Sequence, residues 1–134
     1  MSVTVRQSVL VDWTDAYAQT ATLPMATLEG SVLFLASAAE HTGGYSTGFS
    51  SIALVNTGAY YLALEYLVVT GALEDFWDSG WDNDGFPGIA LLMEVTGLDV
   101  AIGGSDTDSA TSTNPGGGSL TPSSSAFLFG AAVI

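Results

Sequence analysis

The chain is 134 residues long, and fourteen acidic side chains face a single arginine and no lysine, for a formal net charge of −13. Because phosphate recognition needs clustered Lys and Arg, this balance argues against a nucleic-acid partner and equally against an anionic membrane. The chain has no cysteine, which excludes disulfides and thiolate metal sites. Its length predicts one domain over residues 1–134.

Apolar residues make up 48% of the chain and charged residues only 11%. With one permanent cation, ion pairs cannot hold the fold, so we expect stability to rest on apolar burial, with a self-repulsion that salt relieves. This apolar content exceeds what one domain's core requires, which predicts an oligomer or assembly contacts. No apolar run approaches the ~20 residues of a membrane span. The start, MSVTVRQSV, lacks a secretion signal, so we expect the protein to stay in the cytoplasm after synthesis.

Short apolar or β-branched runs, bounded by Gly, Pro or polar turns, predict four strands in the N-terminal half: Val3–Val11, a strand ending at Leu23-Pro24, Ser31–Ala38 and Phe49–Val55. Loops are expected over residues 12–22 and, rich in glycine, over residues 40–48. A turn at residues 56–58 closes the fourth strand. Alternation in the first strand places four valines on one face, Val3, Val5, Val9 and Val11.

The segment of residues 59–70, AYYLALEYLVVT, is ambiguous between helix and strand. Its Ala, Leu and Glu residues suit a helix. Its β-branched and aromatic residues, with Gly58 and Gly71 at the two ends, favour a strand, which is our prediction. An acidic and aromatic loop is expected to follow over residues 74–85.

The stretch Gly88–Leu98, GIALLMEVTGL, is predicted to be a central strand around which the others are organised. Period two places a wholly apolar set on one side, Ile89, Leu91, Met93 and Val95. The opposite side is mixed: Ala90, Leu92, Glu94 and Thr96. This pattern indicates one face in a core and the other partly covered. Since a buried unpaired carboxylate is costly, we expect Glu94 to be hydrogen-bonded near the sheet end or exposed.

Beyond residue 98 we expect a long Gly/Ser/Thr/Asp-rich loop, residues 99–118, with one short strand at Val100–Ile102. A last apolar strand, Ser125–Ile134, is predicted to be central in its sheet or covered by another subunit. The chain then has seven or eight short strands and no predicted helix. This is typical of an all-β protein, an antiparallel β-sandwich.

The order of elements resembles a known family. Its parts here are the strand Glu29–Leu35, a glycine-rich loop ending at Phe49, the Tyr-rich strand Tyr60–Leu64, the element Met93–Asp99, a Ser/Thr/Gly/Asp-rich loop and an apolar strand after Leu120-Thr121-Pro122. This order, over nearly the whole chain, resembles jelly-roll-type β-sandwich modules of phage virion proteins and bacterial surface proteins; Glu-Val-Thr-Gly-Leu-Asp is its most specific part. The resemblance implies capsid decoration, fibre or adhesion roles and no catalytic motif. The insert Glu74–Phe86 departs from the pattern.

One segment, Gly44–Gly48, matches the G-x-S-x-G motif of hydrolases. That motif needs a strand-turn-helix setting and partners in the order Ser, Asp, His. The only histidine, His41, precedes Ser46, and no helix is predicted after it. We therefore interpret the segment as a glycine-rich loop and predict that the protein is not an enzyme.

The segment WDSGWDNDGF places Asp78, Asp82 and Asp84 beside a glycine turn, and such oxygen ligands suit Ca²⁺. The spacing is not that of an EF-hand, because Gly80 stands where its first Asp should be, so a solvated acidic loop is the alternative. Asp106 and Asp108 form a weaker pair.

Four aromatic residues interleave with these acids: Phe76, Trp77, Trp81 and Phe86. Aromatic side chains of this kind anchor protein interfaces or cover one end of a sandwich core, and both readings rank ahead of a glycan site. We predict a structural virion protein, a capsid decoration (cement) protein of a tailed phage. It would bind the major capsid protein or other virion subunits, most simply as a homotrimer, without a cofactor. The alternative is a carbohydrate-binding module of a fibre or adhesin.

Overall fold

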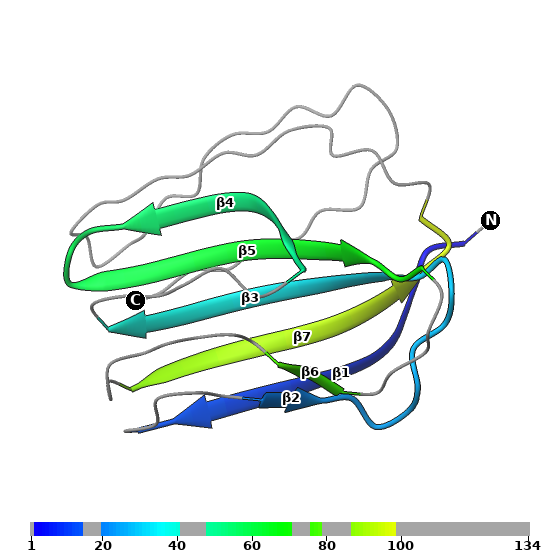
Figure 1. Cartoon of the computed structure of the whole chain (residues 1–134), viewed down its shortest axis with the longest axis horizontal. Coiled ribbons are helices and arrows are strands. Elements are labelled where there is room, and N and C mark those ends of the chain that lie inside the picture. Colours follow the sequence, from blue (N-terminus) through cyan, green and yellow to red (C-terminus); the bar gives the residue numbers. More distant parts are fainter. Residues whose placement is uncertain (1, 15–19, 41–47, 71–75, 79–86, 99–134) are drawn as a thin grey trace.

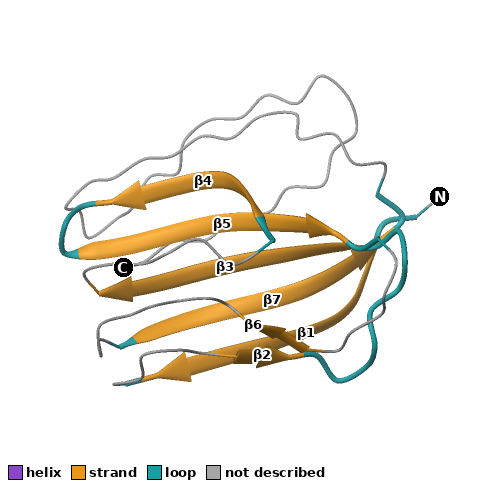
Figure 2. Ribbon diagram, in the orientation of Figure 1, coloured by secondary structure: helices purple, strands orange, loops and turns teal. Residues whose placement is uncertain are grey.

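The computed structural model describes residues 2–14, 20–40, 48–70, 76–78 and 87–98, and the structural statements that follow concern these residues. Their regular structure is entirely β (Figure 2). The strands, in chain order, are β1 (Thr4–Trp13), β2 (Thr20–Thr22), β3 (Val32–Glu40), β4 (Ser50–Asn56), β5 (Tyr60–Val68), β6 (Phe76–Asp78) and β7 (Gly88–Thr96). The all-β class predicted from the sequence is confirmed.

Five of these strands form one antiparallel sheet in the order β1-β7-β3-β5-β4 (Figure 1). The strand β7 lies between β1 and β3 and is therefore inside the sheet, but the central strand is β3, so the prediction that Gly88–Leu98 is the central strand is wrong. The short strands β2 and β6 pair with each other in a separate two-stranded sheet that contacts β1. Residues 59–70 adopt the predicted strand, because β5 pairs with β3 and β4 on its two sides.

One side of the five-stranded sheet, which we call the inner face, carries the main core. Its buried members come from five segments of the chain: Trp13, Ala21, Leu23, Leu33, Leu35, Val69, Ala90 and Leu92. Because Ala21 belongs to β2, this face is the one against which the β2–β6 pair packs. Trp13 and Gly88 are register partners here, and a Cβ added at Gly88 would overlap the Trp13 ring, so the indole requires glycine at that position.

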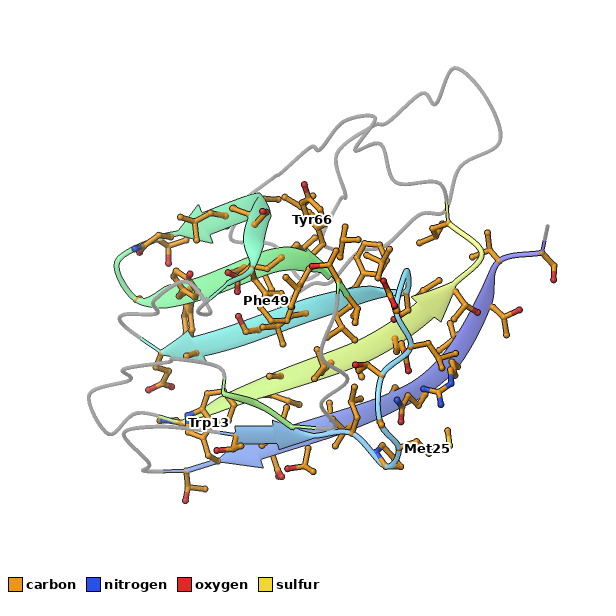
Figure 3. All side chains as sticks on the ribbon, turned by 45° about the vertical axis from the view of Figure 1, so that its right-hand side comes forward. Trp13, Met25, Phe49 and Tyr66 are labelled. Atoms are coloured by element: carbon orange, nitrogen blue, oxygen red, sulfur yellow. The ribbon has the colours of Figure 1, made fainter. Side chains whose placement is uncertain are left out.

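The opposite side, the outer face, has its own smaller cluster at one end of the sheet, where Val32, Phe34 and Val95 are buried. Tyr66, drawn in Figure 3, packs against that cluster. The strand β3 is thus buried on both faces over its first six residues, as expected for the central strand of a sheet.

A β-bulge in β1 places the four valines of this strand differently from the prediction that they share one face. The register shifts between Val5 and Gln7, which leaves Arg6 unpaired in the ladder. Val5 opposes Val95 of the outer face, whereas Val9 opposes Leu92 of the inner face. Since directly opposed residues share a side, the prediction that Val5 and Val9 lie on one face is wrong. Strict alternation cannot anticipate an inserted residue.

The assignment of faces in β7 is also reversed. Ala90, Leu92 and Glu94, from the mixed set, are buried on the inner face. Of the wholly apolar set, Ile89 is exposed, Leu91 and Met93 are half-buried, and only Val95, in the outer-face cluster, is buried. The strand boundaries were predictable from apolar periodicity. Which face is buried depends on the segments that pack against it, and periodicity within the strand carries no information about those segments.

Two further predictions have structural outcomes. The loop expected over residues 74–85 contains the strand β6, which pairs with β2 from Thr20 to Thr22. The predicted turn at residues 56–58 is confirmed: the amide of Gly58, at a φ of 80°, donates a hydrogen bond to Asn56 Oδ1 at 2.9 Å. The predicted elements at Val100–Ile102 and Ser125–Ile134 lie outside the described residues.

Candidate functional site

The predicted acidic-aromatic site is placed only in part. The backbone of Phe76, Trp77 and Asp78 forms β6, in register with Thr22, Ala21 and Thr20 respectively. The remaining candidates lie outside the described residues: Trp81, Asp82, Asp84 and Phe86. The structure therefore brings β6 against β2 and does not test the calcium or glycan predictions.

The other sequence candidates also fall largely outside the described part of the chain. His41 and Ser46 of the G-x-S-x-G segment, and the pair Asp106 and Asp108, are not described. Within the ranges that are described, no three His, Cys, Asp or Glu side chains come together in a way that could hold a metal ion. Calcium binding stays a prediction.

Among the described residues, a polar cluster surrounds Glu94, whose side chain is 0% exposed. Arg6 Nη1 and Gln7 Nε2 each donate a hydrogen bond to Glu94 Oε2 at 2.6 Å. The backbone amide of Leu28 donates to Oε1 at 2.7 Å. The only arginine of the chain is thus paired with a buried carboxylate. The expectation that Glu94 is hydrogen-bonded is confirmed.

Two opposing effects set the protonation of Glu94. Burial raises the pKa of this carboxyl, because removal from water disfavours the charged form. Hydrogen bonds from Leu28, Gln7, Arg6 and Ser31 favour the charged form, and together they bring the pKa below its ordinary value. The carboxylate is therefore ionised at neutral pH, as its three short contacts require.

The same cluster fixes the segment between β2 and β3, residues 23–31, to the edge strand β1. Arg6 Nη1 also donates to the carbonyl of Ala26 at 2.8 Å, and Gln7 exchanges hydrogen bonds with the backbone of Met25 at 2.8 and 2.9 Å. The tip of this segment nevertheless presents large apolar side chains to solvent: Met25 is 47% exposed and Leu28 is 44% exposed. Figure 3 shows Met25 on this segment beside β1. The result is a preorganised loop with an apolar tip.

The second candidate surface is the half of the outer face that lies beyond the Phe34 cluster. Cross-strand partners form two rows across all five strands: Leu10, Leu91, Ala36, Leu64 and Ala53 in one, and Asp12, Ile89, Ala38, Leu62 and Val55 in the next. We call these ten residues the apolar plateau. Leu10 is 62% exposed and Ile89 is 45% exposed, and most of the others are half-buried. The plateau contains one charged side chain, Asp12, at its edge.

Neither surface was singled out from the sequence. The Glu94 cluster joins residues 88 positions apart, and the plateau combines residues of five strands, so no local spacing marks either one. The available signals were the single arginine beside a glutamine in β1 and the unusually apolar alternate positions of β7. Both surfaces suit contacts between proteins rather than chemistry on a small substrate.

Comparison with known proteins adds no identification. No protein-family model matches the chain, and no curated protein or solved structure is significantly similar to it. The described part of the chain contains no helix long and apolar enough to cross a membrane.

Proposed function

We propose that the protein is a structural virion protein, a capsid decoration protein of a tailed phage that binds neighbouring subunits. The observation that carries the proposal is the apolar plateau, an outer sheet face on which leucine, isoleucine, valine and alanine replace the polar side chains that water favours. Antiparallel sheets with one solvated face normally alternate apolar and polar residues, so an apolar outer face indicates that another molecule covers it.

The proposed mechanism is a clamp with two contact surfaces. The plateau buries apolar side chains against one neighbour, and the apolar tip formed by Met25 and Leu28 inserts against a capsid subunit. The hydrogen bonds of Glu94 hold that tip in place before binding, which reduces the entropy lost on docking. The large negative charge keeps free copies apart and soluble until they meet the capsid.

We also propose a more specific fold and assembly as part of the same function. A jelly-roll-like sandwich of seven to eight strands requires a second layer over the inner face, and the packing of Ala21 and Leu23 against Leu33 and Leu92 supports a layer at that position. A homotrimer is the assembly proposed for the capsid, where copies gather around three-fold positions. Each copy would then place its loop tip on a capsid subunit.

The proposal is tested on purified virions of the phage that encodes the chain. Quantitative mass spectrometry is expected to find its peptides at a fixed copy number relative to the major capsid protein. A replication protein of the same phage serves as the control and should be absent from the particles. Absence of the chain from washed, gradient-purified particles would refute a virion role, whatever its behaviour in isolation.

A further inference from the structure

We propose that the Glu94 cluster protects the only peptide bond in these 134 residues that a protease specific for arginine or lysine can cut. The chain has one arginine and no lysine, so that bond joins Arg6 to Gln7. The side chains on both sides of the bond donate hydrogen bonds to the Glu94 carboxylate. The proposal concerns this cluster alone and does not depend on a virion role.

The position of the bond in the sheet would by itself favour cleavage. The strand β1 stands at one end of the sheet order, and its register with β7 shifts between Val5 and Gln7, so that the ladder skips Arg6. A bulged strand at the edge of a sheet opens more readily than an interior strand, because fewer backbone hydrogen bonds have to break. Protection of this bond therefore has to come from side chains.

The cluster holds the group that such a protease recognises. A trypsin-like protease takes the basic side chain into a pocket that contains a carboxylate. In this chain the guanidinium already has a carboxylate partner, because Arg6 Nη1 donates to Glu94 Oε2 at 2.6 Å and also to the carbonyl of Ala26 at 2.8 Å. Only 23% of the arginine side chain is exposed. Recognition by the protease therefore requires that the ion pair with Glu94 be broken.

The residue that follows the bond is held by the same cluster. Gln7 is buried, its Nε2 donates to Glu94 Oε2 and to the carbonyl of Met25, and its Oε1 accepts from the Met25 amide. A protease acts on a segment that has separated from its neighbours, so Arg6 and Gln7 must leave β7 together. That opening removes both side-chain donors from the Glu94 carboxylate, and a buried charge without its partners is costly.

Cleavage would also weaken the attachment of residues 23–31. Hydrolysis adds one water molecule, forms a carboxylate on Arg6 and an amine on Gln7, and separates residues 1–6 from the rest of the chain. The guanidinium then belongs to a short peptide, and its contacts with Glu94 and Ala26 lose the effective concentration that a continuous chain provides. One protected bond thus preserves the whole cluster.

Limited proteolysis with trypsin measures the protection. A synthetic peptide of residues 1–13 gives the cleavage rate of the same bond without the fold, and mass spectrometry identifies the product that begins at Gln7. We expect the folded chain to be cut at least about a hundredfold more slowly than the peptide, because cleavage requires prior opening. Glu94→Gln should be cut at least about tenfold faster than the parent, since the guanidinium loses its charged partner.

The variant Leu92→Ala separates access to the bond from overall stability. Leu92 is buried in the main core on the same strand as Glu94, and the cavity left by alanine should destabilise the whole fold more than Glu94→Gln does. If the cluster controls access, trypsin nevertheless cuts Glu94→Gln faster than Leu92→Ala. Circular dichroism verifies that both variants are folded.

A second variant keeps the test decisive if Glu94→Gln does not fold. Gln7→Ala retains the ion pair but removes the other side-chain donor, and it should be cut several-fold faster than the parent when each rate is divided by that of its own peptide. A parent chain cut as fast as its peptide overturns the proposal, as does faster cleavage of Leu92→Ala than of Glu94→Gln, because global unfolding would then expose the bond. Absence from virions would instead refute only the proposed function.

Discussion

The two faces of β7 are buried in the opposite order from the one that their hydrophobicity predicts. The inner face buries Leu92 beside a fully buried carboxylate, Glu94, while the outer face leaves Leu91 half-covered and Ile89 exposed. Hydrophobicity alone would assign these sides the other way round. What decides burial is the cover: the β2–β6 layer and residues 23–31 lie over the inner face, and the Leu28 amide of that segment donates a hydrogen bond to the carboxylate.

The comparison shows that a buried charge and an exposed leucine have one explanation, namely the groups that cover each face of the strand. Glu94 can be buried because Arg6, Gln7 and the Leu28 amide replace the water that it loses. The leucines of the outer face can be exposed because, in our proposal, a neighbouring subunit covers them during assembly. Variants that act on one face and leave the other unchanged can test this directly.

The largest expected effect comes from a pair of identical substitutions at adjacent positions. Leu92→Ala opens a cavity in the main core and should lower the free energy of unfolding by about 3 kcal/mol. Leu91→Ala removes the same atoms from the half-buried side and should cost about 1 kcal/mol. Urea denaturation of both variants measures the difference. Equal losses would show that the two faces are covered alike, contrary to the structure.

Removing the charge of Glu94 should lower the free energy of unfolding somewhat less than Leu92→Ala does. Glu94→Gln keeps an oxygen for the Leu28 amide but removes the charge that pairs with Arg6, and we expect a loss of about 2 kcal/mol. Glu29→Gln, at an exposed glutamate of the same segment, is the matched control and should change stability by less than about 0.5 kcal/mol. A Glu94→Gln variant as stable as its control would mean that the ion pair contributes nothing to the attachment of residues 23–31.

The strands themselves were predictable from the sequence, and the reason is local. Alternation marked β1, and apolar runs bounded by glycine or polar turns marked β3, β4 and β7. Even the helix-prone residues of β5 were assigned correctly, because aromatic and β-branched side chains outweighed its Ala, Leu and Glu. The short strands β2 and β6 lie in segments predicted to be loops, residues 12–22 and 74–85, since three residues carry too little periodicity to be recognised.

The candidate surfaces were not predictable, because each depends on pairing between distant segments. Arg6 reaches Glu94 only because the bulge at Arg6 lifts it out of the β1 ladder, and no sequence pattern marks the bulge. The plateau appears only when the sheet order is known, since Leu10, Ala36 and Leu64 become neighbours through β7 and β3. The amino-acid composition did indicate that the protein has more apolar surface than its own core can bury.

Lowering the pH should gradually remove the stabilisation that Glu94 gives to the folded protein. Its pKa in the folded protein lies below the ordinary value of 4.5, so the folded state binds this proton less readily than the unfolded state. The stabilisation is fully present above pH 4.5 and is lost as the pH falls through the folded-state pKa. The difference in unfolding free energy between the parent and Glu94→Gln should therefore be constant from neutral pH to about pH 5 and shrink below it. A difference that grows on acidification would contradict this linkage.

The smallest expected effect tests how well the inner face tolerates polar groups that lack a partner. Ser37 is buried between Ala90 and Ala63, and its hydroxyl has no hydrogen-bond partner among the described residues. Ser37→Ala removes that desolvated hydroxyl and completes a row of small apolar side chains, so the free energy of unfolding should stay equal or rise by up to about 1 kcal/mol. Thermal and urea unfolding measure the change, with Ser8→Ala on the exposed side of β1 as the control. A clear loss of stability in Ser37→Ala would show that the inner face, like the Glu94 cluster, depends on a polar contact at this position.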